Sequence, residues 1–246
     1  MKKLFTSLIL LMAGVMATYA TDYNLWVAGT RVTSSNASNI MEGVSYNSST
    51  NVLTLDNCTF SAGENYAIGS SINNLQIKVK GICRVEAAND VFYLEASTEI
   101  NGIFGECGSL YVESTSNSGA AFWVKNGSTL TLYNLWLVAE GKNYCFYGDG
   151  NEKIVMSCLV MKADITEGNG TGAVHGFTLF TQDYGDAYLT TGAFNSTAKA
   201  VCSSSSSTTE LTTVSIDASL YVGSAIARIG STMSLTPEGL SNLKVG

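Results

Sequence analysis

Ionisable side chains, which carry most enzyme chemistry, are scarce in this 246-residue chain. Asp, Glu, Lys and Arg make up 13% of the residues, and there is a single histidine, His175. One histidine excludes His-rich zinc sites and two-histidine dyads. The net charge of −7 argues against a surface for nucleic-acid phosphates. We therefore expect no nucleic-acid partner.

Acidic residues are spread along the chain rather than paired. Glycoside hydrolysis needs two carboxyl groups roughly 5–10 Å apart, and no Asp-Asp or Glu-Asp neighbours occur in the sequence. Asp183 and Asp186 lie in a turn-like segment whose carboxylates suit Ca²⁺, but solvated turns are the default interpretation because EF-hand spacing is missing. We predict no catalytic residue, leave the metal ligands open and consider Ca²⁺ the one candidate cofactor.

Six cysteines are the remaining reactive groups, and no Cys-x-x-Cys pair indicates zinc or redox chemistry. They are Cys58, Cys83, Cys107, Cys145, Cys158 and Cys202. Cys58, Cys83 and Cys158 occupy similar positions in different copies of the repeat described below. In the fourth copy, Leu135 occupies this position. A disulfide between Cys58 and Cys83 and a stack of buried thiols both stay open. Cys145 is interpreted as packing.

The first 20 residues predict a secretory signal peptide. A basic start precedes an apolar run at residues 4–16 that is short for a membrane span, and Ala17 and Ala20 offer cleavage positions. A short membrane anchor is the alternative. We expect the mature protein to be soluble and located outside the cell or at its surface, with the periplasm as the other compartment, and not to insert into a membrane.

A repeated motif recurs roughly every 24 to 30 residues, a period typical of stacked architectures. Its copies lie at residues 65–70, 89–94, 118–124, 143–148 and, more weakly, 172–176. A second motif precedes them at residues 53–57, 77–81, 130–134 and 154–157. A third strand-like segment follows the second motif, at Phe60, Val85, residues 110–112, Leu137 and Val160.

The repeat contains only the alternating pattern of β-strands, with Gly, Asn and Ser at the turns and no helical periodicity. Three short strands per repeat predict one coil of a right-handed parallel β-helix, and stacked coils share one core. A β-sandwich is the competing fold. We expect a capping β-hairpin at residues 21–52, the β-helix at 53–216, and a strand-like segment at 217–246 that would begin a truncated second module.

Stacking converts repeat positions into columns of side chains along the solenoid. Ile68, Phe92, Phe122 and Phe146 should point into the core, and His175 is placed in the same column as a packed or end-capping residue. The alternate column then points outward, with Tyr93, Trp123 and Tyr147 after Gly69. Aromatic faces suit pyranose rings, so we predict that Tyr93, Trp123 and Tyr147 bind ligand. Coverage by a loop, or plain strand preference, is the alternative. Tyr111, Tyr133 and Trp136 should also face outward.

Several segments resemble a family of secreted bacterial proteins, namely residues 23–33, 36–40, 44–46, 51–57, 119–122 and 192–202. The chain is similar, over about residues 23–216, to parallel β-helix carbohydrate-binding proteins with pectate-lyase-like coils, which bind plant cell-wall polysaccharides such as cellulose and pectin. The resemblance implies a non-catalytic protein with a polysaccharide partner. Alternatives are a structural or adhesive surface protein that contacts other proteins or host surfaces, and a polysaccharide lyase or glycoside hydrolase. The glycan, the oligomeric state and any continuation beyond Gly246 stay open.

Overall fold

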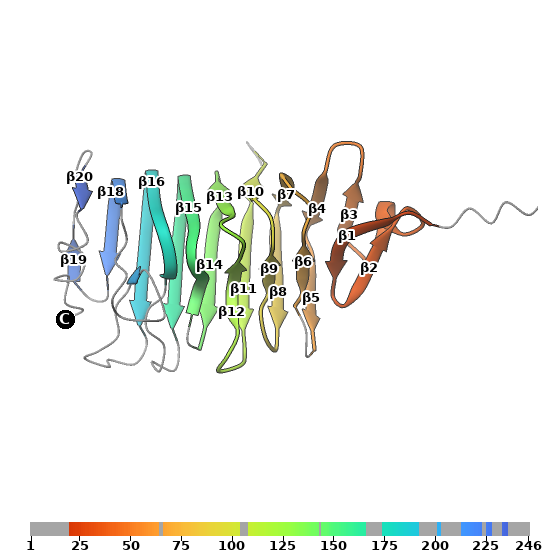
Figure 1. The fold of residues 1–246 in the computed structure, drawn as a ribbon, viewed down its shortest axis with the longest axis horizontal. Coiled ribbons are helices and arrows are strands. Elements are labelled where there is room, and N and C mark those ends of the chain that lie inside the picture. The colour runs from red at the N-terminus through yellow and green to blue at the C-terminus, as the bar shows by residue number, and fades with distance from the viewer. Residues whose placement is uncertain are drawn as a thin grey trace, which may run out of the picture.

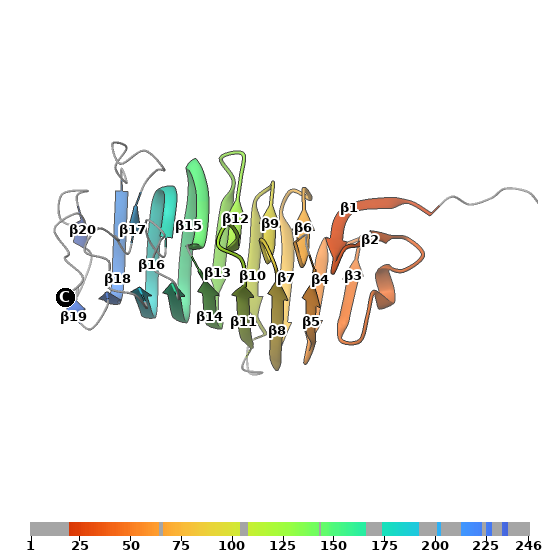
Figure 2. The ribbon, with the colours of Figure 1, turned by 90° about the horizontal axis from the view of Figure 1, so that it is seen from below.

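The computed structural model describes residues 20–63, 66–103, 108–142, 144–165, 174–191, 201–202, 213–222, 225–227 and 233–235. These residues form a parallel β-solenoid, with strands side by side along one long axis (Figures 1 and 2). The described part is all β apart from the short 3-10 helix η1 (Ala37–Asn39), and none of its helices is long and apolar enough to cross a bilayer. The predicted β-helix is therefore confirmed, and the predicted signal peptide lies outside the described residues except for Ala20.

Each coil contributes one strand to each of three parallel sheets. The first sheet contains β6 (Ile68–Ser70), β9 (Phe92–Leu94), β12 (Ala120–Val124) and the starts of β15 (Tyr144–Ile165) and β16 (Val174–Thr191). The second contains β4 (Val52–Asp56), β7 (Leu75–Lys80), β10 (Thr98–Gly102), β13 (Thr129–Tyr133) and the middle of β15. The third contains β5 (Thr59–Ala62), β8 (Ile82–Ala87), β11 (Ser109–Ser114), β14 (Trp136–Gly141) and the end of β15.

Antiparallel strands cap the first coil, as predicted. They are β1 (Asp22–Val27), β2 (Thr30–Thr33) and β3 (Val44–Asn47). Strand β3 forms a hairpin with β4, in which Asn47 pairs with Val52, and β1 lies antiparallel against β6. The cap covers backbone groups that an open edge would offer to another chain.

At the other end, parallel pairing continues beyond the boundary predicted at residue 216. Strand β18 (Thr213–Val222) pairs with β16 as far as Val222. The short strands β19 (Ala225–Ala227) and β20 (Met233–Leu235) then pair antiparallel to β18, while β17 (Val201–Cys202) extends the first sheet. The remainder of the predicted C-terminal segment lies outside the described residues.

The core consists of inward-facing columns. Phe92, Phe122 and Phe146 are fully buried, and successive ring centroids lie 4.7 and 4.9 Å apart with nearly parallel planes. The second sheet adds a matching aliphatic column, formed by Leu53, Ile77, Ile100, Leu132 and Met156. The predicted inward set is confirmed, and Ile100 belongs to a coil whose second-sheet strand the repeat did not reveal.

Asparagine and glycine turn the chain between the second and third sheets. Asn57 and Asn134 have positive φ angles of 46° and 48°, and Gly81 has one of 62°. Asparagine and glycine tolerate this left-handed conformation better than other residues do. The Nδ2 atom of Asn134 donates a hydrogen bond to the Gly102 carbonyl of the preceding coil at 3.1 Å. These corners give the repeat much of its Gly and Asn content.

Candidate functional site

A column of rings runs along the outside of the first sheet. Tyr93, Trp123 and Tyr147 are consecutive register partners on β9, β12 and β15, and His175 on β16 follows Tyr147. Tyr66 lies beside Tyr93 at the other end. We call these five residues the aromatic column. The structure thus brings together the three predicted ligand-binding residues and adds two rings.

Successive rings of the aromatic column lie at regular intervals. The centroid distances are 5.2 Å for Tyr66–Tyr93, 5.4 Å for Tyr93–Trp123, 5.5 Å for Trp123–Tyr147 and 5.2 Å for Tyr147–His175. Trp123 is the exception in orientation, since its plane is turned by 85° from Tyr93 and by 80° from Tyr147, whereas the other two pairs are stacked. Edge-to-face and offset-stacked arrangements are both favourable for aromatic pairs.

Tyr66 enters the column because the residue on β6 is a glycine. Gly69 is the register partner of Tyr93, and a Cβ atom at Gly69 would overlap the Tyr66 ring. The missing side chain therefore leaves room for Tyr66 to stack on Tyr93. Sequence alone could not show that the Tyr66 ring fills the position that a side chain at Gly69 would take, because Tyr66 lies three residues before Gly69.

The rings are less exposed than an open platform would be. Tyr66, Tyr93, Trp123 and Tyr147 are half-buried, and His175 is buried. The indole Nε1 of Trp123 is buried without a hydrogen-bond partner among the described residues. Ring-to-ring packing uses part of the aromatic surface, so the column contributes to stability as well as offering a surface.

Polar groups border the aromatic column at the ends of β9 and β12. The Lys125 Nζ atom donates a hydrogen bond to Tyr93 Oη at 3.0 Å, and this hydroxyl donates to Glu95 Oε1 at 3.3 Å. The hydrogen bond to Tyr93 is the main reason that the pKa of Lys125 is raised. The same ammonium lies 4.9 Å from the Trp123 ring centroid, within cation–π range.

His175 corrects one prediction from the sequence. Val174, not His175, continues the phenylalanine column, because Phe146 pairs with Val174 and Tyr147 pairs with His175. The prediction that His175 is packed holds, since its side chain is fully buried and stacks on Tyr147. Burial lowers the pKa of His175 to about 4, so the imidazole is neutral near pH 7.

Asp90, just before β9, gives a pH-dependent test of the local structure. Burial raises its pKa to about 6, although its Oδ1 accepts a hydrogen bond from the Ala120 N–H at 2.9 Å. Between about pH 4 and pH 6 the folded state therefore holds a proton that the unfolded chain has released. Stability should fall as pH rises through this window.

We predict that Asp90→Asn stabilises the protein by about 1 kcal/mol at pH 7.5, a value reduced for solvent screening. The amide oxygen still accepts from Ala120, and no charge is buried. Urea unfolding should show little gain at pH 3.5, where Asp90 is mostly protonated in both states. An equal difference at the two pH values would show that Asp90 titration does not contribute.

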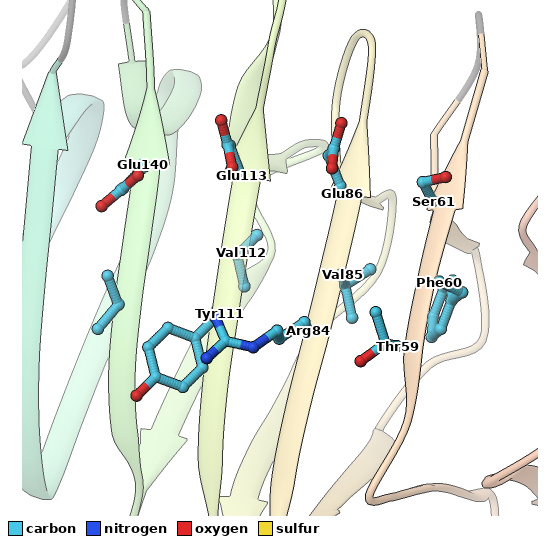
Figure 3. Close-up of a pocket in the computed structure, with 11 residues that line it drawn as sticks. Thr59, Phe60, Ser61, Arg84, Val85, Glu86, Tyr111, Val112, Glu113 and Glu140 are labelled. Atoms are coloured by element: carbon cyan, nitrogen blue, oxygen red, sulfur yellow. The ribbon is translucent and has the colours of Figure 1, made fainter.

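A second candidate surface, a groove of about 580 Å³, lies on the outside of the third sheet (Figure 3). Glu86, Glu113 and Glu140 are register partners on β8, β11 and β14, and Ser61 precedes them on β5. We call these three glutamates the carboxylate row. The expectation that acidic residues are unpaired is wrong for this row, because stacking makes distant residues neighbours.

Beside the carboxylate row lies an interaction between Arg84 and Tyr111. The Arg84 guanidinium carbon is 4.1 Å from the Tyr111 ring centroid. Tyr111 faces outward as predicted, and so do Tyr133 and Trp136, which are 45% and 54% exposed. Arg84 therefore has a structural role that its sequence position did not indicate.

The cysteine positions are partly different from those predicted. Cys58 and Cys83 are buried thiols, and contact with Cys83 together with burial raises the pKa of Cys58. The column that contains Cys83 continues with Leu110, Leu137 and Met161 on the following coils. Leu137, rather than the predicted Leu135, is therefore equivalent to Cys83. Met161, rather than the predicted Cys158, occupies the equivalent position on the next coil. Buried Cys145 donates to the Ala139 carbonyl, consistent with packing. Cys107 lies outside the described residues, as do the side chains of Cys158 and Cys202.

Among the described residues, no group of three or more His, Cys, Asp or Glu side chains could hold a metal ion. The side chains of Asp183 and Asp186, considered for Ca²⁺, lie outside the described part. Comparisons of the chain with protein-family models, curated proteins and solved structures gave no match.

Proposed function

We propose that this protein binds a polysaccharide without cleaving it, and that the half-buried rings of the aromatic column contact the sugar chain. The observation that carries the proposal is the regular spacing of the rings, 5.2 to 5.5 Å over four consecutive intervals. A surface that repeats along one axis suits a ligand that repeats along one axis. A linear glycan is such a ligand, with apolar C–H faces that pack on aromatic rings.

Trp123 is the ring best placed to contact sugar. It is half-buried, lies in the middle of the column, and stacks face to face on neither neighbour. Lys125 and Glu95 supply a donor and an acceptor for sugar hydroxyls at the border of the column. The resemblance to secreted carbohydrate-binding β-helix proteins supports the same proposal, as does the predicted signal peptide.

Trp123→Ala should weaken binding to the recognised polysaccharide at least tenfold, a loss of about 1.4 kcal/mol, because a central ring is removed. Affinity gel electrophoresis of the folded variant in polysaccharide-containing gels measures the change. Trp123→Phe is the matched control: it keeps a ring and removes the buried indole N–H that lacks a partner. Unchanged mobility of folded Trp123→Ala relative to wild type would show that the column is purely structural.

A glycoside hydrolase is the second candidate, and one observation favours it. The carboxylate row places carboxyl groups on adjacent strands, which lie about 4.8 Å apart, near the separation of about 5 Å in retaining hydrolases. Burial and the neighbouring Glu86 and Glu140 raise the pKa of Glu113, as suits a general acid. New reducing ends in polysaccharide incubated with the protein, absent with Glu113→Gln, would establish hydrolysis.

A further inference from the structure

Two cysteines from successive coils meet at the corner between the second and third sheets. Cys58 directly precedes β5, and Cys83 is the second residue of β8. Thr59 and Arg84 are register partners on these neighbouring strands (Figure 3), and the Arg84 N–H donates a hydrogen bond to the Cys58 carbonyl at 2.9 Å. Cys58 and Cys83 therefore occupy equivalent positions on the first two coils.

The placement of the two residues suits a disulfide bond. Equivalent residues on adjacent strands have Cα atoms about 4.8 Å apart, and disulfides usually join Cα atoms about 4.4–6.8 Å apart. Both side chains belong to the core, since Cys58 is 2% exposed and Cys83 is fully buried. The structure contains both residues as thiols, and the two side chains are in hydrogen-bond contact. Little backbone movement is therefore needed to join them.

The contact makes the two sulfurs chemically unequal. The Cys58 S–H donates to the Cys83 sulfur, which stabilises the Cys83 thiolate and lowers the pKa of Cys83. The same hydrogen bond, together with burial, raises the pKa of Cys58. The thiolate is the form of cysteine that attacks a disulfide. Cys83 is thus the attacking thiol of the pair, and Cys58 is the thiol that completes the bond.

The pair lies just beneath the surface. The neighbouring side chains of Thr59 and Ile82 are exposed. Opening of this corner alone, or incomplete packing of the coils during folding, would let an oxidant reach the sulfurs. Once the corner has closed, burial protects a bond between Cys58 and Cys83 from reduction.

The position in the solenoid gives such a bond a structural consequence. Cys58 lies against the N-terminal cap, because a Cβ atom at Gly43 would come within 3.0 Å of the Cys58 Cβ atom. A bond to Cys83 would join the coil beneath the cap to the next coil. Each coil of a solenoid contacts only its neighbours, so the end coils have the fewest contacts to hold them. The bond would act at one of these ends.

We propose that Cys58 and Cys83 form a disulfide bond when the protein is exported, and that this bond fastens the first coil to the second. The predicted signal peptide would take the chain to an oxidising compartment, where disulfides persist. The proposal does not depend on polysaccharide binding, so the two can fail separately.

The oxidant is a small or protein disulfide, and the reaction is thiol–disulfide exchange. The Cys83 thiolate attacks one sulfur of that disulfide, forms a mixed disulfide and releases the other sulfur as a thiolate. Cys58 then loses its proton and attacks the Cys83 sulfur, which releases the second sulfur of the oxidant. The two cysteines lose two electrons and two protons, and the oxidant becomes two thiols.

The first test identifies the bond directly. The full-length reduced protein is incubated with oxidised glutathione, its remaining thiols are alkylated in denaturant, and tryptic peptides are analysed by mass spectrometry without reduction. We expect a linked pair of peptides that contain Cys58 and Cys83, which separates on reduction. Alkylation of both cysteines after oxidation, or linkage of Cys58 to any other cysteine, would overturn the proposal.

The second test measures whether the bond fastens the coils. Oxidised wild-type protein should melt about 5–10 °C higher than the reduced protein, because the bond closes a loop of roughly 25 residues in the unfolded chain. Cys58→Ala and Cys83→Ala should each abolish this shift. Cys145→Ala is the matched control, since Cys145 is also fully buried, and it should keep the shift. Equal melting temperatures of oxidised and reduced wild type, or an unchanged shift in Cys83→Ala, would contradict the structural role.

Discussion

Replacement of Phe122 by alanine will lower the free energy of unfolding by about 3–5 kcal/mol, the usual cost of deleting a buried aromatic ring. Phe122 is fully buried, and its ring lies between those of Phe92 and Phe146 at centroid distances of 4.7 and 4.9 Å. Its loss therefore opens a cavity that touches two coil interfaces at once. In a stack where each coil contacts only its neighbours, a defect in the middle weakens both halves.

Urea unfolding followed by circular dichroism measures this change. Ile82→Ala is the control, because Ile82 is also an apolar strand residue but is 55% exposed. The control should lose no more than about 0.5 kcal/mol. A loss below about 1 kcal/mol for Phe122→Ala would mean that the phenylalanine column does not support the stack.

Gly43→Ala will destabilise the N-terminal cap by about 3 kcal/mol. Gly43 has a φ of 72°, a conformation that costs an L-residue roughly 1–2 kcal/mol. A Cβ atom there would also overlap the backbone carbonyl of Asp56 and press on Cys58. The strands cannot separate easily, because the Asp56 N–H donates a hydrogen bond to the Gly43 carbonyl at 2.8 Å. Relief of such overpacking costs about 1–3 kcal/mol more.

Gly29→Ala separates the two contributions. Gly29 has a φ of 73°, yet nothing lies within 4 Å of the position that its Cβ would take. This variant should lose only the conformational part, about 1–2 kcal/mol. Thermal unfolding of both variants provides the comparison, and equal losses would show that the close approach of Gly43 to Asp56 is unimportant.

The sequence predicted the architecture well where the repeat was regular. Alternation around Phe92, Phe122 and Phe146 placed both the core column and the outward Tyr93, Trp123 and Tyr147 correctly. In a strand, the choice of one inward residue determines the direction of its neighbours. The hairpin of β3 and β4 was equally clear, because polar turn residues separate two alternating strands.

Register failed where the repeat was weak. His175 was assigned to the phenylalanine column, but the fifth copy is aligned one residue differently, and a one-residue slip moves a side chain to the other face. The coil containing β10 was missed as a second-sheet copy because Ile100 is its one large aliphatic residue. The residues on either side of Ile100 pair with the adjacent strands through backbone hydrogen bonds. Such bonds do not change the hydropathy pattern of the sequence.

The candidate sites needed three-dimensional information of two kinds. The carboxylate row depends on the register of β8, β11 and β14, which makes Glu86, Glu113 and Glu140 neighbours although 27 residues separate each from the next in the sequence. Ring orientation in the aromatic column depends on packing, as shown by Tyr66 above Gly69 and by the turned plane of Trp123. Neither feature follows from residue type alone.

Binding of the folded protein to an array of plant, fungal and bacterial polysaccharides tests the proposed function most directly. The account predicts that at least one linear polysaccharide retains the wild-type protein and that Trp123→Ala loses most of that signal. Absence of binding to every glycan on the array, by protein that circular dichroism shows to be folded, would contradict the account.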